Sequence, residues 1–127
     1  MDILIRFGFT IEEIKNMMDA NENINSVSDK DMYELIDILS KVGCLEKHIK
    51  NIFICNPFYL TRDINEINNL IKKMYELGLN NLYILFDSNP YILNLSDNEL
   101  ENMYNKKLQE GLTKEEVINF INYNTII

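Results

Sequence analysis

Several residue types on which enzymes and secreted proteins depend are scarce in this 127-residue sequence. It has one histidine and two cysteines, and it contains no nucleophile elbow, phosphate-binding loop or dinucleotide fingerprint. Two cysteines cannot form a disulfide framework, so a reduced, cytoplasmic setting is expected. These absences predict a protein that is not an enzyme and that uses no cofactor and no small-molecule substrate.

Long apolar runs are absent as well. No stretch approaches the roughly 18 apolar residues that a membrane-spanning helix requires. The N-terminal MDILIRFGF lacks the basic region that begins a secretory signal. We therefore expect no membrane segment and no targeting peptide. The length and the 46% hydrophobic content are typical of a single globular domain, residues 1–127.

Glycine and proline are also scarce, but their positions form a pattern. The four glycines are separated by 35, 35 and 33 residues, and an asparagine follows each one at a nearly constant distance. Both prolines directly follow such an asparagine. A fixed period in this range indicates stacked helical repeats. The positions that define the period are Gly8, Gly43, Gly78, Gly111, Asn21, Asn56, Asn89 and Asn124, with Pro57 and Pro90.

Apolar residues between these markers recur at helical spacing on both sides of each asparagine. The prediction is an all-α solenoid of about three and a half two-helix repeats, with a short apolar plug or 3₁₀ turn after Asn-Pro. The expected boundaries are residues 1–8 (partial), 9–43, 44–78, 79–111 and 112–127 (partial).

Helix ends carry their own signals. Thr10 with Glu13 and Ser96 with Glu99 have the spacing of capping boxes. Asn80 is the expected cap of the first helix in the third repeat. Each glycine should adopt a left-handed conformation at a helix end.

The sequence also predicts where the repeated asparagines and the aromatic residues of the plugs lie. Each repeated asparagine is expected to end a helix, because asparagine tolerates the left-handed conformation. Most aromatic residues fall on apolar positions and should be in the core. The hydroxyls of Tyr59 and Tyr91, which lie in the plugs, are expected to reach solvent.

The strings FGFTIEEIKNMM, NPFYL, NPYIL and SDNELENMYNKKLQEGLTKEEV resemble repeats of the mitochondrial transcription termination factor family. The resemblance covers nearly the whole chain. It implies a superhelical solenoid built from helix, short helix and helix. It also implies nucleic-acid binding along a basic concave face and a role in organellar transcription or translation. The first repeat departs from the pattern, with Glu22 in place of the proline.

Charge is unevenly distributed. The net charge is -8 and the pI is near 4.6, which disfavours contact with phosphate backbones and anionic membranes. Residues 41–75 are nevertheless net basic. Their bases could form a phosphate-binding patch, or they could be a solvated surface. These bases are Lys41, Lys47, Lys50, Arg62, Lys72 and Lys73.

The spacing of Cys44, His48 and Cys55 would suit a metal site on one helix face. The repeat favours another interpretation. Cys44 takes an apolar position and His48 takes the position of Glu13, and no fourth ligand is evident. We expect no bound metal.

Three functions remain open at this point. The first is a binding module for another protein, and the alternative is a nucleic-acid-binding regulator that uses the basic middle repeat. A third is an acidic mimic of nucleic acid. Because solenoids need polar caps, the apolar residues at the two ends predict self-association or partner docking there. These residues are Ile3, Leu4, Phe7, Ile126 and Ile127.

Overall fold

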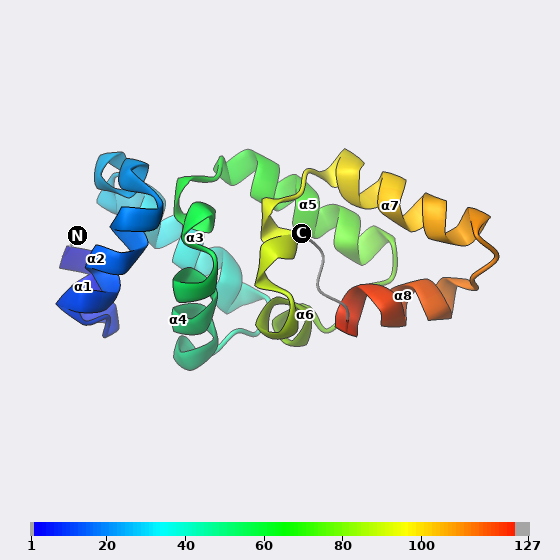
Figure 1. Ribbon diagram of the computed structural model, residues 1–127, viewed down its shortest axis with the longest axis horizontal. Coiled ribbons are helices and arrows are strands. Elements are labelled where there is room, and N and C mark those ends of the chain that lie inside the picture. The colour runs from blue at the N-terminus through cyan, green and yellow to red at the C-terminus, as the bar shows by residue number, and fades with distance from the viewer. Residues whose placement is uncertain (1, 124–127) are drawn as a thin grey trace. The chain divides into compact units, whose positions relative to one another are not determined.

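The computed structural model describes residues 2–123, and these are organised as eight α-helices and three 3₁₀ helices without a strand (Figure 1). This confirms the all-α helical-repeat class. The order α, 3₁₀, α occurs three times in succession. The elements are α1 Asp2–Phe7, α2 Ile11–Ala20, η1 Glu22–Ser26, α3 Asp29–Lys41, α4 Glu46–Cys55, η2 Pro57–Thr61, α5 Ile64–Glu76, α6 Leu82–Ser88, η3 Pro90–Asn94, α7 Asp97–Gln109 and α8 Lys114–Tyr123.

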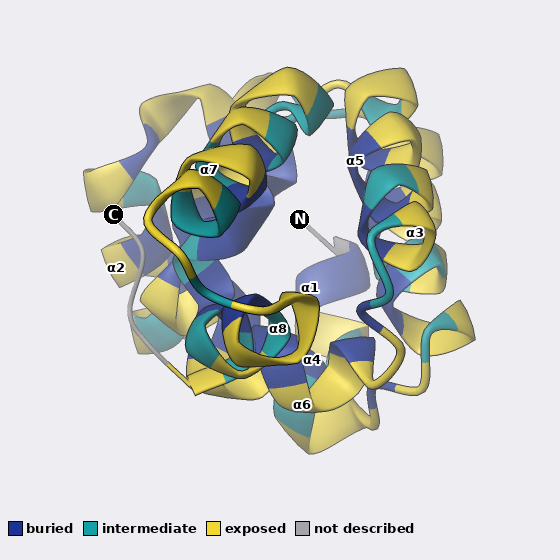
Figure 2. Cartoon of the chain, turned by 90° about the vertical axis from the view of Figure 1, so that its right-hand side faces the viewer, coloured by how far each residue is buried: buried dark blue, intermediate teal, exposed yellow. Residues whose placement is uncertain are grey.

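The chain forms two compact units, one up to Ile64 and the other from Asn65 onward. In the first unit, α3 packs against α1, α4 and η2, and α2 packs against α4 and η2. In the second unit, α8 packs against α6 and α7. Buried residues run along one side of helices such as α3 and α7, and exposed residues run along the other (Figure 2). The expectation of a single domain over residues 1–127 stays a prediction.

The glycines end their helices as predicted. All four have a positive φ, between 95° and 112°, which favours glycine because it has no side chain to clash. At Gly8 the chain closes a Schellman motif, in which the Phe9 N–H donates to the Leu4 carbonyl at 3.0 Å. The same pairing recurs after the other three glycines, so each helix end is defined locally by one residue.

The predicted 3₁₀ turns follow both Asn-Pro pairs, as η2 and η3. A third one, η1, forms without proline. Its Ile24 is buried like Tyr59 and Ile92, which occupy the equivalent position three residues after an asparagine. The turn therefore depends on one apolar side chain that enters the core, and proline is dispensable.

Tyr59 corrects one expectation. Its side chain is fully buried, and its hydroxyl donates a 2.7 Å hydrogen bond to the Leu35 carbonyl. Burial raises the pKa of the Tyr59 hydroxyl far above its ordinary value. The expectation that this hydroxyl reaches solvent is wrong, because the plug lies between α3 and α4. Tyr91 is half-buried.

The repeated asparagines end helices as predicted, because Asn21, Asn56 and Asn89 are the C-caps of α2, α4 and α6. They do so without the left-handed conformation, since no described residue other than glycine has a positive φ. They are instead the buried polar side chains of residues 3–123: Asn21, Asn56 and Asn89. Each backbone N–H donates to the last turn of one helix, and each carbonyl accepts from the 3₁₀ turn that follows. The asparagine is thus the junction between the two elements.

Helix starts agree with the sequence in most places. The capping boxes at Thr10 and Ser96 are both formed. The expected cap Asn80 is wrong by one residue, because Asn81 occupies the N-cap of α6. At α4 the cap is Leu45, whose N–H donates to Nδ1 of His48 at 3.0 Å. The leucine side chain has no oxygen that could accept a hydrogen bond from the backbone N–H of His48, so only half of a capping box forms there.

Candidate nucleic-acid interface

The six predicted bases fall into both compact units. Four lie in the first unit, on α3, α4 and the segment after η2, and two lie next to each other on α5 in the second. Two of the six are exposed without an ion pair, two are held by carboxylates, and one contacts backbone. The sixth, Arg62, is half-buried at the end of η2, two residues before α5 begins.

Lys50 supports the fold directly. Its ammonium donates a 3.0 Å hydrogen bond to the Gly8 carbonyl and lies 5.6 Å from the centroid of the Phe9 ring. The carbonyl belongs to the residue that ends α1, where a positive charge is favourable. Replacing Lys50 would therefore disturb the packing of α4 on the preceding repeat as well as any ligand.

Lys41 and Lys73 are neutralised locally. Lys41 lies 2.9 Å from the Asp37 carboxylate, and this hydrogen bond raises the pKa of Lys41. Lys73 lies 3.0 Å from Glu101 on α7 and 3.4 Å from Glu76, and the bond to Glu101 raises the pKa of Lys73. A charge shared in this way is a weaker ligand for phosphate.

Lys47 and Lys72 are the accessible members of the set. Both are exposed, and neither forms an ion pair with any residue in the described part of the chain. Lys47 projects from the first turn of α4 and Lys72 from α5. These two side chains can contact a phosphate without giving up an internal partner.

The N-terminal apolar residues pack within the first unit. Leu4 is fully buried and Ile3 nearly so, while Phe7 is half-buried. Ile3 and Phe7 line a hollow of about 230 Å³ together with Arg6, Tyr33 and Ile36. Ile126 and Ile127 lie outside the described residues, so end-to-end association stays a prediction.

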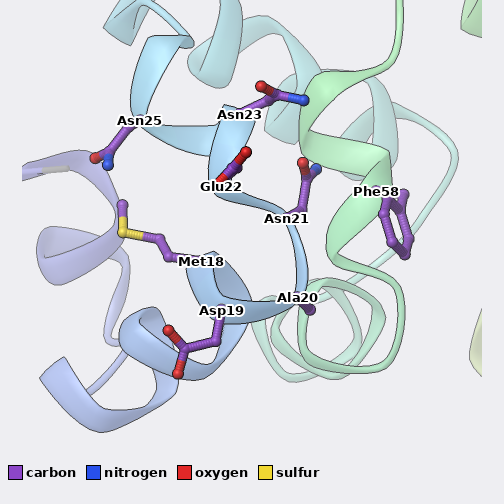
Figure 3. A pocket seen from close by; sticks show the side chains of 8 residues that line it. All are labelled: Met18, Asp19, Ala20, Asn21, Glu22, Asn23, Asn25 and Phe58. Atoms are coloured by element: carbon purple, nitrogen blue, oxygen red, sulfur yellow. The ribbon is translucent and has the colours of Figure 1, made fainter.

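A larger hollow, of about 610 Å³, opens beside the junction between α2 and η1 (Figure 3). The sequence reasoning did not find it. Its polar lining comes from the segment 19–25. Phe58 is contributed by η2 of the next repeat (Figure 3). The lining residues are Met18, Asp19, Ala20, Asn21, Glu22, Asn23, Asn25 and Phe58.

The cysteines and the histidine do not form a metal centre. Cys44 is buried and Cys55 is exposed, and His48 accepts a hydrogen bond at the start of α4. Within residues 2–123 no group of three or more histidine, cysteine or acidic side chains could hold a metal ion. No helix in that range is long and apolar enough to cross a membrane.

The left-handed glycines, the asparagine junctions and the recurring α, 3₁₀, α order define a helical-repeat protein. A family model described as mTERF matches residues 1–127, so the chain belongs to the mTERF family. This family match confirms the resemblance to transcription termination factors. Comparisons with curated proteins and with solved structures gave no match.

Proposed function

We propose that this chain is a non-catalytic helical-repeat module that binds nucleic acid and acts in transcription. The observation that carries the proposal is the family match, which extends over every residue of the chain. The proposed contacts are electrostatic and involve Lys47 in the first compact unit and Lys72 in the second, because each of these bases is exposed and forms no ion pair with the described residues.

The overall charge determines how such binding should behave. A net charge of -8 repels phosphate at long range, and salt weakens both that repulsion and the local attraction. With few phosphate contacts, affinity should be modest. Such binding depends on contacts with the phosphate backbone, so it should show little preference for nucleic-acid sequence.

Fluorescence anisotropy with short labelled single- and double-stranded RNA and DNA tests the proposal. On duplex DNA, log affinity should fall with log salt at a slope of about -0.9 per phosphate contacted. The double variant Lys47→Glu/Lys72→Glu should weaken binding and reduce the magnitude of that slope by about 2. Absence of binding at low salt to all four probes would overturn the proposal.

A matched control separates local contacts from net charge. Lys30→Glu/Lys114→Glu makes the same change in total charge at two exposed positions outside residues 41–75. It should weaken binding less than the Lys47 and Lys72 pair. Equal loss in both double variants would mean that the middle repeat has no special role.

Two further expectations remain proposals. We propose that the chain has no catalytic activity, which assays of purified protein for nuclease and nucleotide-hydrolysis activity would test. The cytoplasmic location expected from the sequence can be tested by fractionating source cells, and recovery of the protein in an organelle would contradict it.

A further inference from the structure

The hollow of about 230 Å³ between α1 and α3 is apolar except for one arginine. Ile3 and Phe7 on α1 and Tyr33 and Ile36 on α3 line it, and Arg6 is the one charged residue of the lining. Tyr33 is 64% exposed and Ile36 is half-buried, so apolar surface remains open to solvent. Exposed apolar surface beside a charged group is typical of a docking site.

The second unit contains the equivalent groove, between α5 and α7. Lys73 on α5 lies 3.4 Å from Glu76 and 3.0 Å from Glu101 on α7, so an ion network joins the two helices. Tyr104 on α7 is only 5% exposed. Side chains of the unit itself therefore close this groove. Counted from the glycines and the capping serines, the residues equivalent to the hollow lining are Lys73, Glu76, Leu77, Glu101 and Tyr104.

The first unit lacks this closing network. Ile3 and Tyr33 occupy the places of Lys73 and Glu101, and neither is charged, so no ion pair can join α1 to α3 there. Arg6 takes the place of an acid. It is exposed and forms no ion pair with residues 3–123. The groove thus stays open, and no carboxylate among those residues neutralises its cation.

The elements on either side of the groove indicate which shape fits it. The helix α1 has six residues, whereas α3, α5 and α7 have thirteen each. At 1.5 Å per residue, α1 therefore covers about 10 Å less of its neighbour than a full-length helix would. The groove between two packed helices accepts the ridge of side chains of a third helix. An α-helix is thus the shape that fits.

We propose that this hollow binds an amphipathic α-helix of a partner protein, which presents a large apolar side chain with an acidic residue beside it. The apolar side chain enters between α1 and α3, and the carboxylate pairs with Arg6, whose planar guanidinium suits bidentate contact. A spacing of three or four residues places both groups on one side of the partner helix. The surface contains neither Lys47 nor Lys72, so the proposal goes beyond nucleic-acid binding.

The net charge of -8 does not prevent an acidic residue from binding here. At physiological ionic strength, charges separated by more than about 8 Å are largely screened from each other. Repulsion from distant carboxylates is therefore weakened more than the direct contact with Arg6. A nucleic-acid phosphate could also reach Arg6, but it would leave the apolar walls of the hollow uncovered.

The first test uses the full chain and a labelled, alanine-based helical peptide with leucines at i and i+4 and a glutamate beside them. Fluorescence anisotropy at physiological salt should show binding with a Kd on the order of 100 µM. Tyr33→Ala should weaken binding about fivefold to tenfold. The matched control Tyr75→Ala removes an exposed tyrosine of α5 and should leave the affinity within about twofold. Equal loss in the two variants would overturn the proposal.

A charge exchange tests the contact with Arg6. Arg6→Glu should weaken binding of the glutamate peptide about threefold to tenfold. A peptide with lysine in place of glutamate should bind Arg6→Glu more tightly than it binds the unaltered chain. Lys114→Glu makes the same change in net charge at an exposed position on α8, and it should keep the preference for glutamate. The same loss in Lys114→Glu would mean that net charge alone acts, and the proposal would fail.

Three further outcomes would overturn the proposal. A proline in the middle of the peptide should abolish binding, because it breaks the helix, and unchanged binding would exclude a helical partner. Displacement of the peptide by oligouridine would assign the hollow to nucleic acid. Sedimentation of the chain alone should show a monomer, whereas a dimer that Tyr33→Ala abolishes would assign the hollow to a second copy.

Discussion

Lys50 in the first compact unit and Ile118 in the second occupy equivalent positions, one residue after the first buried position of the helix. Each covers the glycine that lies immediately before the preceding repeat. Lys50 donates to the Gly8 carbonyl at 3.0 Å. Ile118 instead places its Cδ1 3.2 Å from the point where a Cβ on Gly78 would lie. One glycine is covered by a charge and the other by a methyl group.

The plugs differ in the same way. Tyr59 enters the first unit and donates to a helix carbonyl, whereas Ile92 enters the second unit and is wholly apolar. In the second unit, the ion pair between Lys73 on α5 and Glu101 on α7 lies at the surface. The backbone pattern of the repeat thus tolerates either kind of side chain at these positions. What is common is the left-handed glycine, the buried asparagine and one large side chain after it.

Replacing Tyr59 by isoleucine, the residue at the equivalent position 92 of the second unit, should have the largest effect. Tyr59→Ile removes a buried ring and its hydrogen bond, and it should lower the free energy of unfolding by about 2 to 4 kcal/mol. Tyr59→Phe keeps the ring and should cost about 1 kcal/mol. Urea denaturation measures both. If the two variants were equally stable, the ring would contribute nothing and the comparison would fail.

The Ile118 side chain over Gly78 should make that glycine more sensitive to substitution than Gly111. Gly111→Ala meets no atom within 4 Å, so it should cost only the left-handed backbone, about 1 to 2 kcal/mol. Gly78→Ala meets the Ile118 Cδ1 as well and should cost about 1 kcal/mol more. Thermal and urea unfolding of the pair measure the difference. A smaller loss at Gly78 than at Gly111 would contradict tight packing there.

Alkaline pH should act on the first unit through Tyr59. Because the folded state raises the pKa of this hydroxyl above the value near 10 of an unfolded tyrosine, the stabilisation is complete below that pH. It is lost as pH rises above 10 towards the folded pKa, at up to about 1.4 kcal/mol per pH unit. Urea unfolding across this range should show a shallower decline in Tyr59→Phe. Identical pH profiles would exclude this cause.

Replacing Lys50 by isoleucine, the residue at the equivalent position 118, should have the smallest effect. Lys50→Ile loses the bond to the Gly8 carbonyl, which remains accessible to water, and it should cost about 0.5 to 1.5 kcal/mol. Lys50→Met keeps most of the apolar stem and separates the loss of the charge from that of packing. Hydrogen exchange at the Phe9 amide, which closes the Schellman motif, reports the local change. Unchanged protection in both variants would show that the bond is dispensable.

The sequence predicts well those features that depend on neighbours in the chain. The glycine ends, the 3₁₀ turns after Asn-Pro and the boxes at Thr10 and Ser96 all follow from residues a few positions apart. His48 shows how far this extends, since its place in the repeat matches Glu13 and its Nδ1 accepts the same kind of backbone N–H. Repeat alignment was therefore a better guide to His48 than metal-ligand spacing.

The candidate sites could not be predicted to the same extent, because their contacts join one repeat to the next. Asn21 bonds to groups 36 and 40 residues away, and Lys50 bonds to one 42 residues away. Composition does not reveal which partner a lysine or an asparagine will find. The period near 35 residues was the available signal, since it places Asn21 beside the plug that contains Phe58.

The most direct test of nucleic-acid binding is an NMR titration of the labelled full chain with single-stranded RNA at low salt. We predict that RNA shifts signals around Lys47 and Lys72 and leaves the Asn21, Asn23 and Asn25 side-chain amides in place. No shifts with RNA at low salt, or shifts that avoid both lysines, would contradict the account.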